Sequence, residues 1–88
     1  MEYKVRSPSH MDLNQMFTRE LTQAGHVRRF TIREAGGHGW EVREEEDHRI
    51  VKRTWMRDWH RVENAMMRFG LEATQLQRAG WVEISNTV

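Results

Sequence analysis

The chain has 88 residues, of which 38% are hydrophobic and 31% charged, with no cysteine and a formal net charge of +1. This length fits one small domain, and such a chain buries only about 60% of the surface that its unfolded form exposes. The absence of cysteine excludes a disulfide scaffold, no apolar run approaches the roughly 18 residues of a membrane span, and the N-terminus lacks the apolar core of a signal peptide. We therefore expect a cytoplasmic protein that avoids membranes and forms a homodimer to complete its core.

The N-terminal quarter of the chain divides into an arm and a predicted helix. Residues 1–11 contain the only proline, Pro8, and no sustained hydrophobic period, which predicts a flexible arm before one α+β domain over residues 12–88. Asp12 is a suitable helix cap and Gly25 a suitable stop. Apolar side chains recur between them at helical spacing, which predicts a short helix over residues 12–24 that packs on the domain through Leu13, Met16, Phe17 and Leu21.

A change to a two-residue period predicts strands after this helix. Phe30 and Ile32 alternate with polar residues, a glycine-rich turn follows at residues 35–39, and Trp40 and Val42 alternate in the same way. The two strands therefore share one apolar face. The acidic run of residues 44–47 is expected to keep this hairpin soluble and to protect an edge. Residues 49–55 are rich in β-branched and aromatic side chains and predict a third strand, whose buried face the pattern leaves open.

The strongest periodic signal predicts a long helix after Asp58, which is a suitable N-cap. Gly80 fits the left-handed position that ends a helix, with Trp81 folding back on the last turn. The apolar positions recur every three or four residues at Val62, Ala65, Met66, Phe69, Ala73 and Leu76. Val82 and Ile84 fit a short edge strand. The predicted fold is α+β, with a three-stranded antiparallel meander, one long C-terminal helix packed on it and a short N-terminal helix.

The residues that carry catalytic or metal chemistry do not form a recognisable constellation. The histidines lack the i, i+4 helical spacing that directs two imidazoles to one ion, and the glycine-rich turn lacks the lysine of a phosphate loop. The adjacent acids of residues 44–47 have no apolar surroundings to raise a pKa. We therefore expect no enzyme activity, no metal and no cofactor.

The four tryptophans suggest a binding surface as well as a core. Trp59, in the first turn of the long helix, is the one most expected to be exposed. Together with Arg53, Arg57 and Arg61 it matches the stacking rings and phosphate-binding cations of a nucleic-acid platform. The isoelectric point of about 8.3 lies below the value of roughly 9 that marks an obvious nucleic-acid binder. The leading hypothesis is thus a self-associating, non-catalytic interaction module, and nucleic-acid binding is the alternative.

The order of hairpin, third strand and long helix resembles the layout of a WGR-type module, a small domain found in nucleic-acid-associated proteins. The resemblance spans about residues 28–81. It rests on Trp55 and Arg57 around the namesake position, Ala65 and Phe69 on the helix, and the terminal Gly80 and Trp81. Met56 stands where that family has its central glycine, and the long glycine-containing loop before the family's helix is missing. The resemblance concerns the fold and implies no function by itself.

Overall fold

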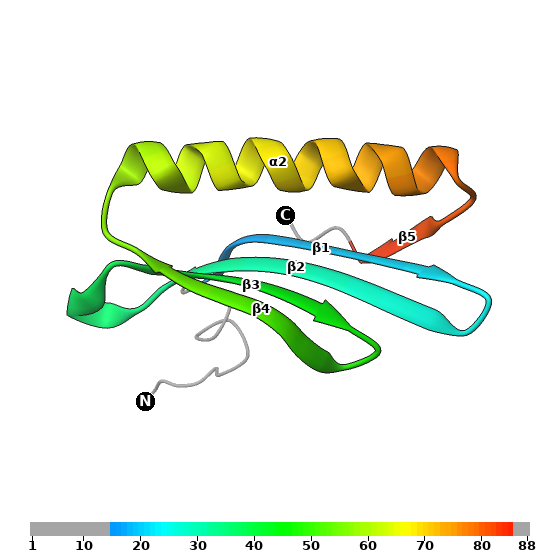
Figure 1. Ribbon diagram of the computed structural model, residues 1–88, viewed down its shortest axis with the longest axis horizontal. Coiled ribbons are helices and arrows are strands. Elements are labelled where there is room, and N and C mark those ends of the chain that lie inside the picture. Colours follow the sequence, from blue (N-terminus) through cyan, green and yellow to red (C-terminus); the bar gives the residue numbers. More distant parts are fainter. Residues whose placement is uncertain (1–14, 86–88) are drawn as a thin grey trace, which may run out of the picture.

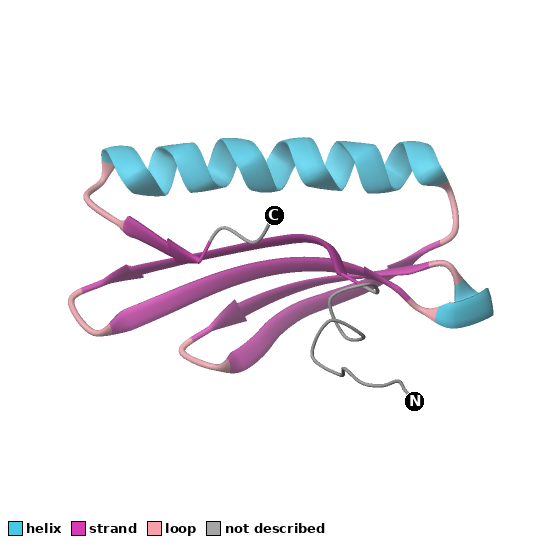
Figure 2. Ribbon diagram, turned by 180° about the vertical axis from the view of Figure 1, so that it is seen from behind, coloured by secondary structure: helices cyan, strands magenta, loops and turns pink. Residues whose placement is uncertain are grey.

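The computed structural model describes residues 15–85, which form one antiparallel sheet and one long helix (Figure 1). The elements follow the chain as β1 (Gln15–Gln23), β2 (His26–Glu34), β3 (Trp40–Glu46), β4 (Arg49–Met56), α2 (Trp59–Arg78) and β5 (Val82–Ser85). The five strands lie in the order β4-β3-β2-β1-β5. Helix α2 crosses one face of the sheet, so that β5 pairs with β1 at the margin opposite β4 (Figure 2). The α+β class, the antiparallel sheet and the long helix are therefore confirmed, while the sheet has five strands instead of three.

The predicted N-terminal helix is wrong, because residues 15–23 form β1. Phe17, Arg19 and Leu21 alternate on the side that faces α2, and Phe17 lies 5.9 Å from Phe69 between ring centroids. Gly25 does not end a helix. It shares with Ala24 a two-residue hairpin turn in which φ is positive at both positions, 53° and 82°, as a type I′ turn requires. Residues 1–14, which include the predicted arm and Leu13, lie outside the described part of the chain.

A second two-residue turn, Asp47 and His48, joins β3 to β4 and also has positive φ at both positions. The Asp47 carboxylate accepts a hydrogen bond from the Val27 amide at 2.9 Å and lies 3.0 Å from the His26 ring nitrogen. The hydrogen bond from the Val27 amide, and to a smaller extent the contact with His26, hold the pKa of the Asp47 carboxyl below its ordinary value. The turn therefore ties the β3–β4 hairpin to the end of the β1–β2 hairpin.

Helix α2 begins and ends where the sequence predicts. The Asp58 side chain accepts a hydrogen bond from the His60 amide at 3.0 Å. At the other end Gly80 has φ 102°, and the Trp81 amide donates to the Leu76 carbonyl at 2.9 Å while the Gly80 amide donates to Gln77 at 3.1 Å. This is the Schellman arrangement, and it directs the chain back toward the sheet as β5.

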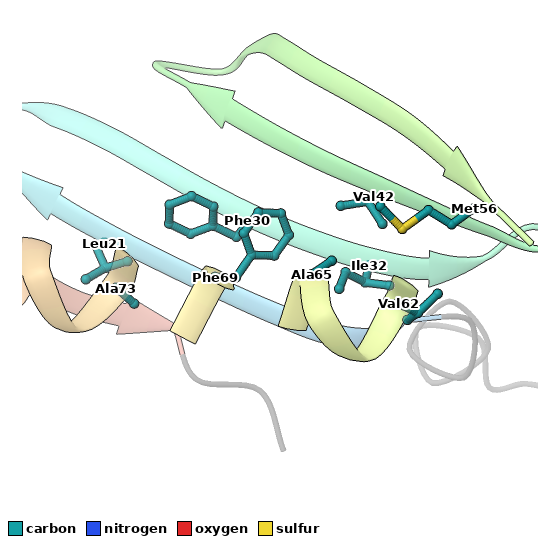
Figure 3. Packing of buried hydrophobic residues seen from close by; sticks show 9 residues of the cluster. All are labelled: Leu21, Phe30, Ile32, Val42, Met56, Val62, Ala65, Phe69 and Ala73. Carbon is teal, nitrogen blue, oxygen red and sulfur yellow. The ribbon is translucent and has the colours of Figure 1, made fainter. Parts of the chain in front are cut away.

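The hydrophobic core lies between α2 and the sheet (Figure 3). Phe69 is its centre, since its ring lies 4.9 Å from that of Phe30 and is only 1% exposed. Ile32 and Val42 are direct cross-strand partners on the same face, which confirms the shared apolar face predicted for this hairpin. The buried apolar residues are Leu21, Phe30, Ile32, Val42, Met56, Val62, Ala65, Phe69 and Ala73. A core of this size fills one side of the sheet only.

The glycine-rich connection between β2 and β3 is a turn, as predicted, and contains a short 3-10 segment at Gly36–His38. Gly39 has φ 92°, and a Cβ at this position would collide with the carbonyl oxygen of Met56. The end of β4 therefore packs closely against this turn because residue 39 has no side chain.

Candidate interaction surface

Strand β4 forms one edge of the sheet, with β3 as its only neighbour among the described strands (Figure 1). Its apolar side chains Ile50, Val51 and Trp55 are 45%, 52% and 56% exposed. An edge strand presents a row of unpaired backbone amide and carbonyl groups to its surroundings. β4 therefore combines backbone hydrogen-bonding groups with exposed apolar surface.

The two faces of β4 carry different side chains. Thr54 lies opposite Val42 and Lys52 opposite Glu44, which places both on the side that α2 covers. Arg53 and Trp55 alternate with them and lie on the other face. The register shifts at Val51, because Glu44 pairs with Lys52 but Glu45 pairs with Ile50. This bulge leaves residues 52–56 as the regular stretch of the edge.

Five basic side chains on or near β4 have no ion-pair partner among the described residues, whereas the arginines 19, 28, 33, 43 and 53 all do. Helix α2 adds to this excess of charge because its first turn contains no acidic side chain but does contain Arg61. A cation in the first turn is repelled by the positive, N-terminal end of the helix dipole and does not stabilise the helix. We call these exposed, unpaired cations the basic edge: Arg49, Lys52, Arg57, Arg61 and Arg68.

A groove of about 370 Å³ lies between β4 and α2. Three members of the basic edge, Lys52, Arg61 and Arg68, line it together with one acid, Glu44. The remaining lining is polar or apolar and comes from Val42, Thr54, Met56 and Asn64. The groove therefore offers an excess of positive charge directly beside the edge strand.

A second hollow, of about 340 Å³, lies on the other side of β4. It is mostly apolar and is lined by Ala35, His38, Trp55 and Arg57. Because Trp55 and Thr54 are adjacent in a strand, their side chains point to opposite faces. The basic groove and the apolar hollow therefore flank the same short stretch of backbone.

The sheet face opposite α2 carries a buried carboxylate surrounded by arginines. Glu41 is only 2% exposed and accepts from Arg33 Nε at 2.9 Å and from Arg43 Nη2 at 3.1 Å, with Arg53 Nε at 2.8 Å. Burial alone would raise the pKa of the Glu41 carboxyl, but hydrogen bonds from Arg43 and Arg33 and their positive charges hold the pKa below its ordinary value. Arg53 thus forms an ion pair with Glu41 within the sheet, whereas the cations of the basic edge are unpaired among the described residues.

The structure distributes the residues predicted for nucleic-acid contact over several places. Arg53 binds Glu41 on the face opposite α2, whereas Arg61 lines the groove on the α2 side. Arg57 lines the apolar hollow. Trp59 is 42% exposed but is not the most exposed tryptophan, since Trp55 is 56% exposed; the Trp59 ring lies 5.4 Å from that of Trp40. Arg53 and Arg61 therefore belong to different surfaces.

The residues predicted for contact did not include Lys52, Arg68 or the strongly exposed Trp55, although Trp55 carried part of the family resemblance. Two periodic signals point to them. Lys52 and Thr54 alternate with Arg53 and Trp55 in the strand, and Arg61, Asn64 and Arg68 recur at three and four residues along the helix. The sequence thus shows a basic stripe on the helix that follows a basic strand. Only the strand order of the sheet shows that this stripe lies beside a sheet edge.

Within residues 15–85, no group of three or more histidine, aspartate or glutamate side chains is arranged to hold a metal ion. No helix in the same part of the chain has both the length and the apolar character needed to cross a membrane. Comparison of the chain with protein-family models, curated proteins and solved structures finds no match. The resemblance to WGR-type modules stays a prediction.

Proposed function

We propose that this protein is a non-catalytic interaction module that binds an extended, acidic protein segment along β4. The observation that carries the proposal is the coincidence of an edge strand with five exposed cations that make no ion pair with any described residue. Backbone hydrogen bonds from an added strand supply affinity, and charge complementarity selects the partner.

The charge of β4 both limits and directs strand addition. Lysine and arginine on an edge, and a bulge such as that at Val51, are devices that prevent indiscriminate pairing with apolar strands. The same cations favour a strand that carries carboxylates, since opposite charges across a strand pair are stabilising and like charges are not. β3 is itself such a strand, because Glu44 and Glu46 lie opposite Lys52 and Arg49.

Nucleic acid is the alternative polyanion, favoured by the exposed rings of Trp55 and Trp59. The polypeptide is preferred because only a polypeptide matches the spacing of the free backbone groups of β4. The formal net charge of +1 also provides little long-range attraction for a phosphate backbone.

Self-association, which the small core suggests, remains part of the proposal but uses a different edge. Two antiparallel copies of β4 would bring Lys52 and Arg53 of one copy close to the same cations of the other. Strand β5 instead exposes Val82 and Ile84, at 60% and 53%, and its Glu83 already binds Arg19. A dimer through β5 is therefore expected to persist at high salt, and sedimentation equilibrium at 0.5 M salt returning only a monomer mass would contradict it.

The main proposal is tested by fluorescence anisotropy of a labelled acidic peptide added to the full chain. We expect binding that weakens with ionic strength and weakens strongly when alternate peptide amides are N-methylated, because methylation removes strand hydrogen bonds and keeps charge. Arg61→Glu should weaken binding about five- to tenfold, since exposed charge pairs contribute up to ~1 kcal/mol each and reversal makes the contact repulsive.

Arg78→Glu is the matched control, because Arg78 is also an exposed, unpaired helix arginine but lies in the last turn of α2, away from the basic groove. Equal loss in both variants would show that only overall charge matters. An N-methylated peptide that binds as well as its parent would exclude strand addition. Tighter binding of a single-stranded oligonucleotide than of any acidic peptide would favour the nucleic-acid alternative instead.

A further inference from the structure

The two faces of β4 differ enough to specify the sequence pattern of its partner. This inference rests on the proposed function and concerns which acidic segments the edge selects. A strand added beside β4 would direct its own side chains alternately to the two faces of the extended sheet. Each face of the partner would therefore meet one of the two cavities that flank residues 52–56.

On the α2 side the partner would meet cations. Lys52, Arg61 and Arg68 line the groove there, and a single acid, Glu44, leaves a surplus of two positive charges. None of the three cations has an ion-pair partner among residues 15–85. Carboxylates entering the groove would gain charge-assisted hydrogen bonds without displacing an existing ion pair.

On the other side the partner would meet apolar surface. Trp55 is 56% exposed and lines the hollow with Ala35, His38 and Arg57. Arg53, its neighbour on this face, is already bound to Glu41 at 2.8 Å and so offers less to a new carboxylate. An apolar side chain placed against the indole would bury surface of both molecules.

We propose that β4 selects segments in which acidic and apolar residues alternate, with the acidic residues in the basic groove and the apolar residues against Trp55. The ligand class is thus an amphipathic acidic strand and not any acidic chain. A register shift of one residue would move every side chain of the partner to the other face of the sheet. An acidic and apolar composition alone is therefore insufficient for tight binding.

The test compares two labelled hexapeptides of identical composition with the same Ser-Gly flanks, one alternating Glu and Val and the other with three Glu followed by three Val. We expect the alternating peptide to bind at least about tenfold more tightly, a difference of one power of ten in Kd. Arg68→Gln should remove most of this preference, and Arg78→Gln, the matched helix control, should keep it.

Trp55→Ala supplies a second readout, because an exposed ring can be removed without affecting the core. It should weaken the alternating peptide several-fold and leave the block peptide unchanged. Equal affinity of the two peptides would overturn the inference and leave the proposed function standing. Failure of both peptides to bind at low salt would overturn the inference and the proposed function together.

Discussion

The arginine cluster around Glu41 leads to a prediction that is independent of any partner. Glu41→Gln keeps the size of the side chain and removes its charge. Three guanidinium groups lie within 2.8 to 3.1 Å of this one carboxylate, which is 2% exposed. The substitution therefore removes the negative charge on which all three cations converge.

The expected loss follows from the burial of each partner. A hydrogen bond to a charged group contributes about 1.5–3 kcal/mol, and breaking a fully buried ion pair costs about 3–5 kcal/mol. The side chains of Arg33, Arg43 and Arg53 are 45%, 23% and 45% exposed, so they regain water when the charge is removed, and the glutamine oxygen still accepts hydrogen bonds. We expect the free energy of unfolding to fall by about 2–3 kcal/mol at pH 7.

The assay is urea unfolding followed by tryptophan fluorescence, at several pH values. Because the pKa of Glu41 in the folded protein is lowered, its stabilising contribution is complete above the unfolded pKa of about 4.3 and is lost as the pH falls through the folded pKa. The difference between wild type and variant should thus be constant from pH 7 to about pH 5 and then shrink. Glu63→Gln, on an exposed helix position, is the control and should change stability by less than about 0.5 kcal/mol. A loss of that small size at Glu41, or a difference that grows toward acid pH, would refute the reasoning.

Three further substitutions test the packing and the helix propensity of α2. Phe69→Ala should lower the free energy of unfolding by about 3–5 kcal/mol in urea titration, because Phe69 is 1% exposed at the centre of the core, whereas Met67→Ala at a 66% exposed position should have little effect. Gly70→Ala should raise it by about 1 kcal/mol, because a Cβ there meets nothing within 4 Å and alanine favours a helix; a lower melting temperature would indicate an unseen contact at this position.

The sequence was sufficient for elements whose signals are local. Asp58 and Gly80 marked the ends of α2, and the alternation at Phe30, Ile32 and Val42 predicted the shared face of β2 and β3. In each case capping or periodicity operates within a few residues and agrees with the tertiary contacts. The third strand was also located, but the exposure of its Trp55, which lies on the sheet face opposite α2, was not predicted.

The sequence was insufficient for β1 because a charged residue interrupts its core-facing side. Arg19 lies between Phe17 and Leu21 on that side and binds Glu83 of β5, with Nη2 to Oε1 at 2.8 Å. Without knowledge of Glu83, 64 residues further along the chain, the alternation is hidden and the apolar spacing matches a helix instead. The candidate surface was only partly predicted from the sequence for the same reason. The strand order that makes β4 an edge is a non-local property.

The pairing of β5 with β1 has a consequence for the kinetics of folding. Strands β1 to β4 are joined by short turns, so their contacts close small loops at little entropic cost. The β1–β5 contacts instead join the two ends of the described chain, with Leu21 opposite Glu83, and close a loop that contains α2. Pairing between strands so far apart in the sequence is expected to form late in folding. Substitutions in β5 should therefore accelerate unfolding and leave the refolding rate of the meander nearly unchanged.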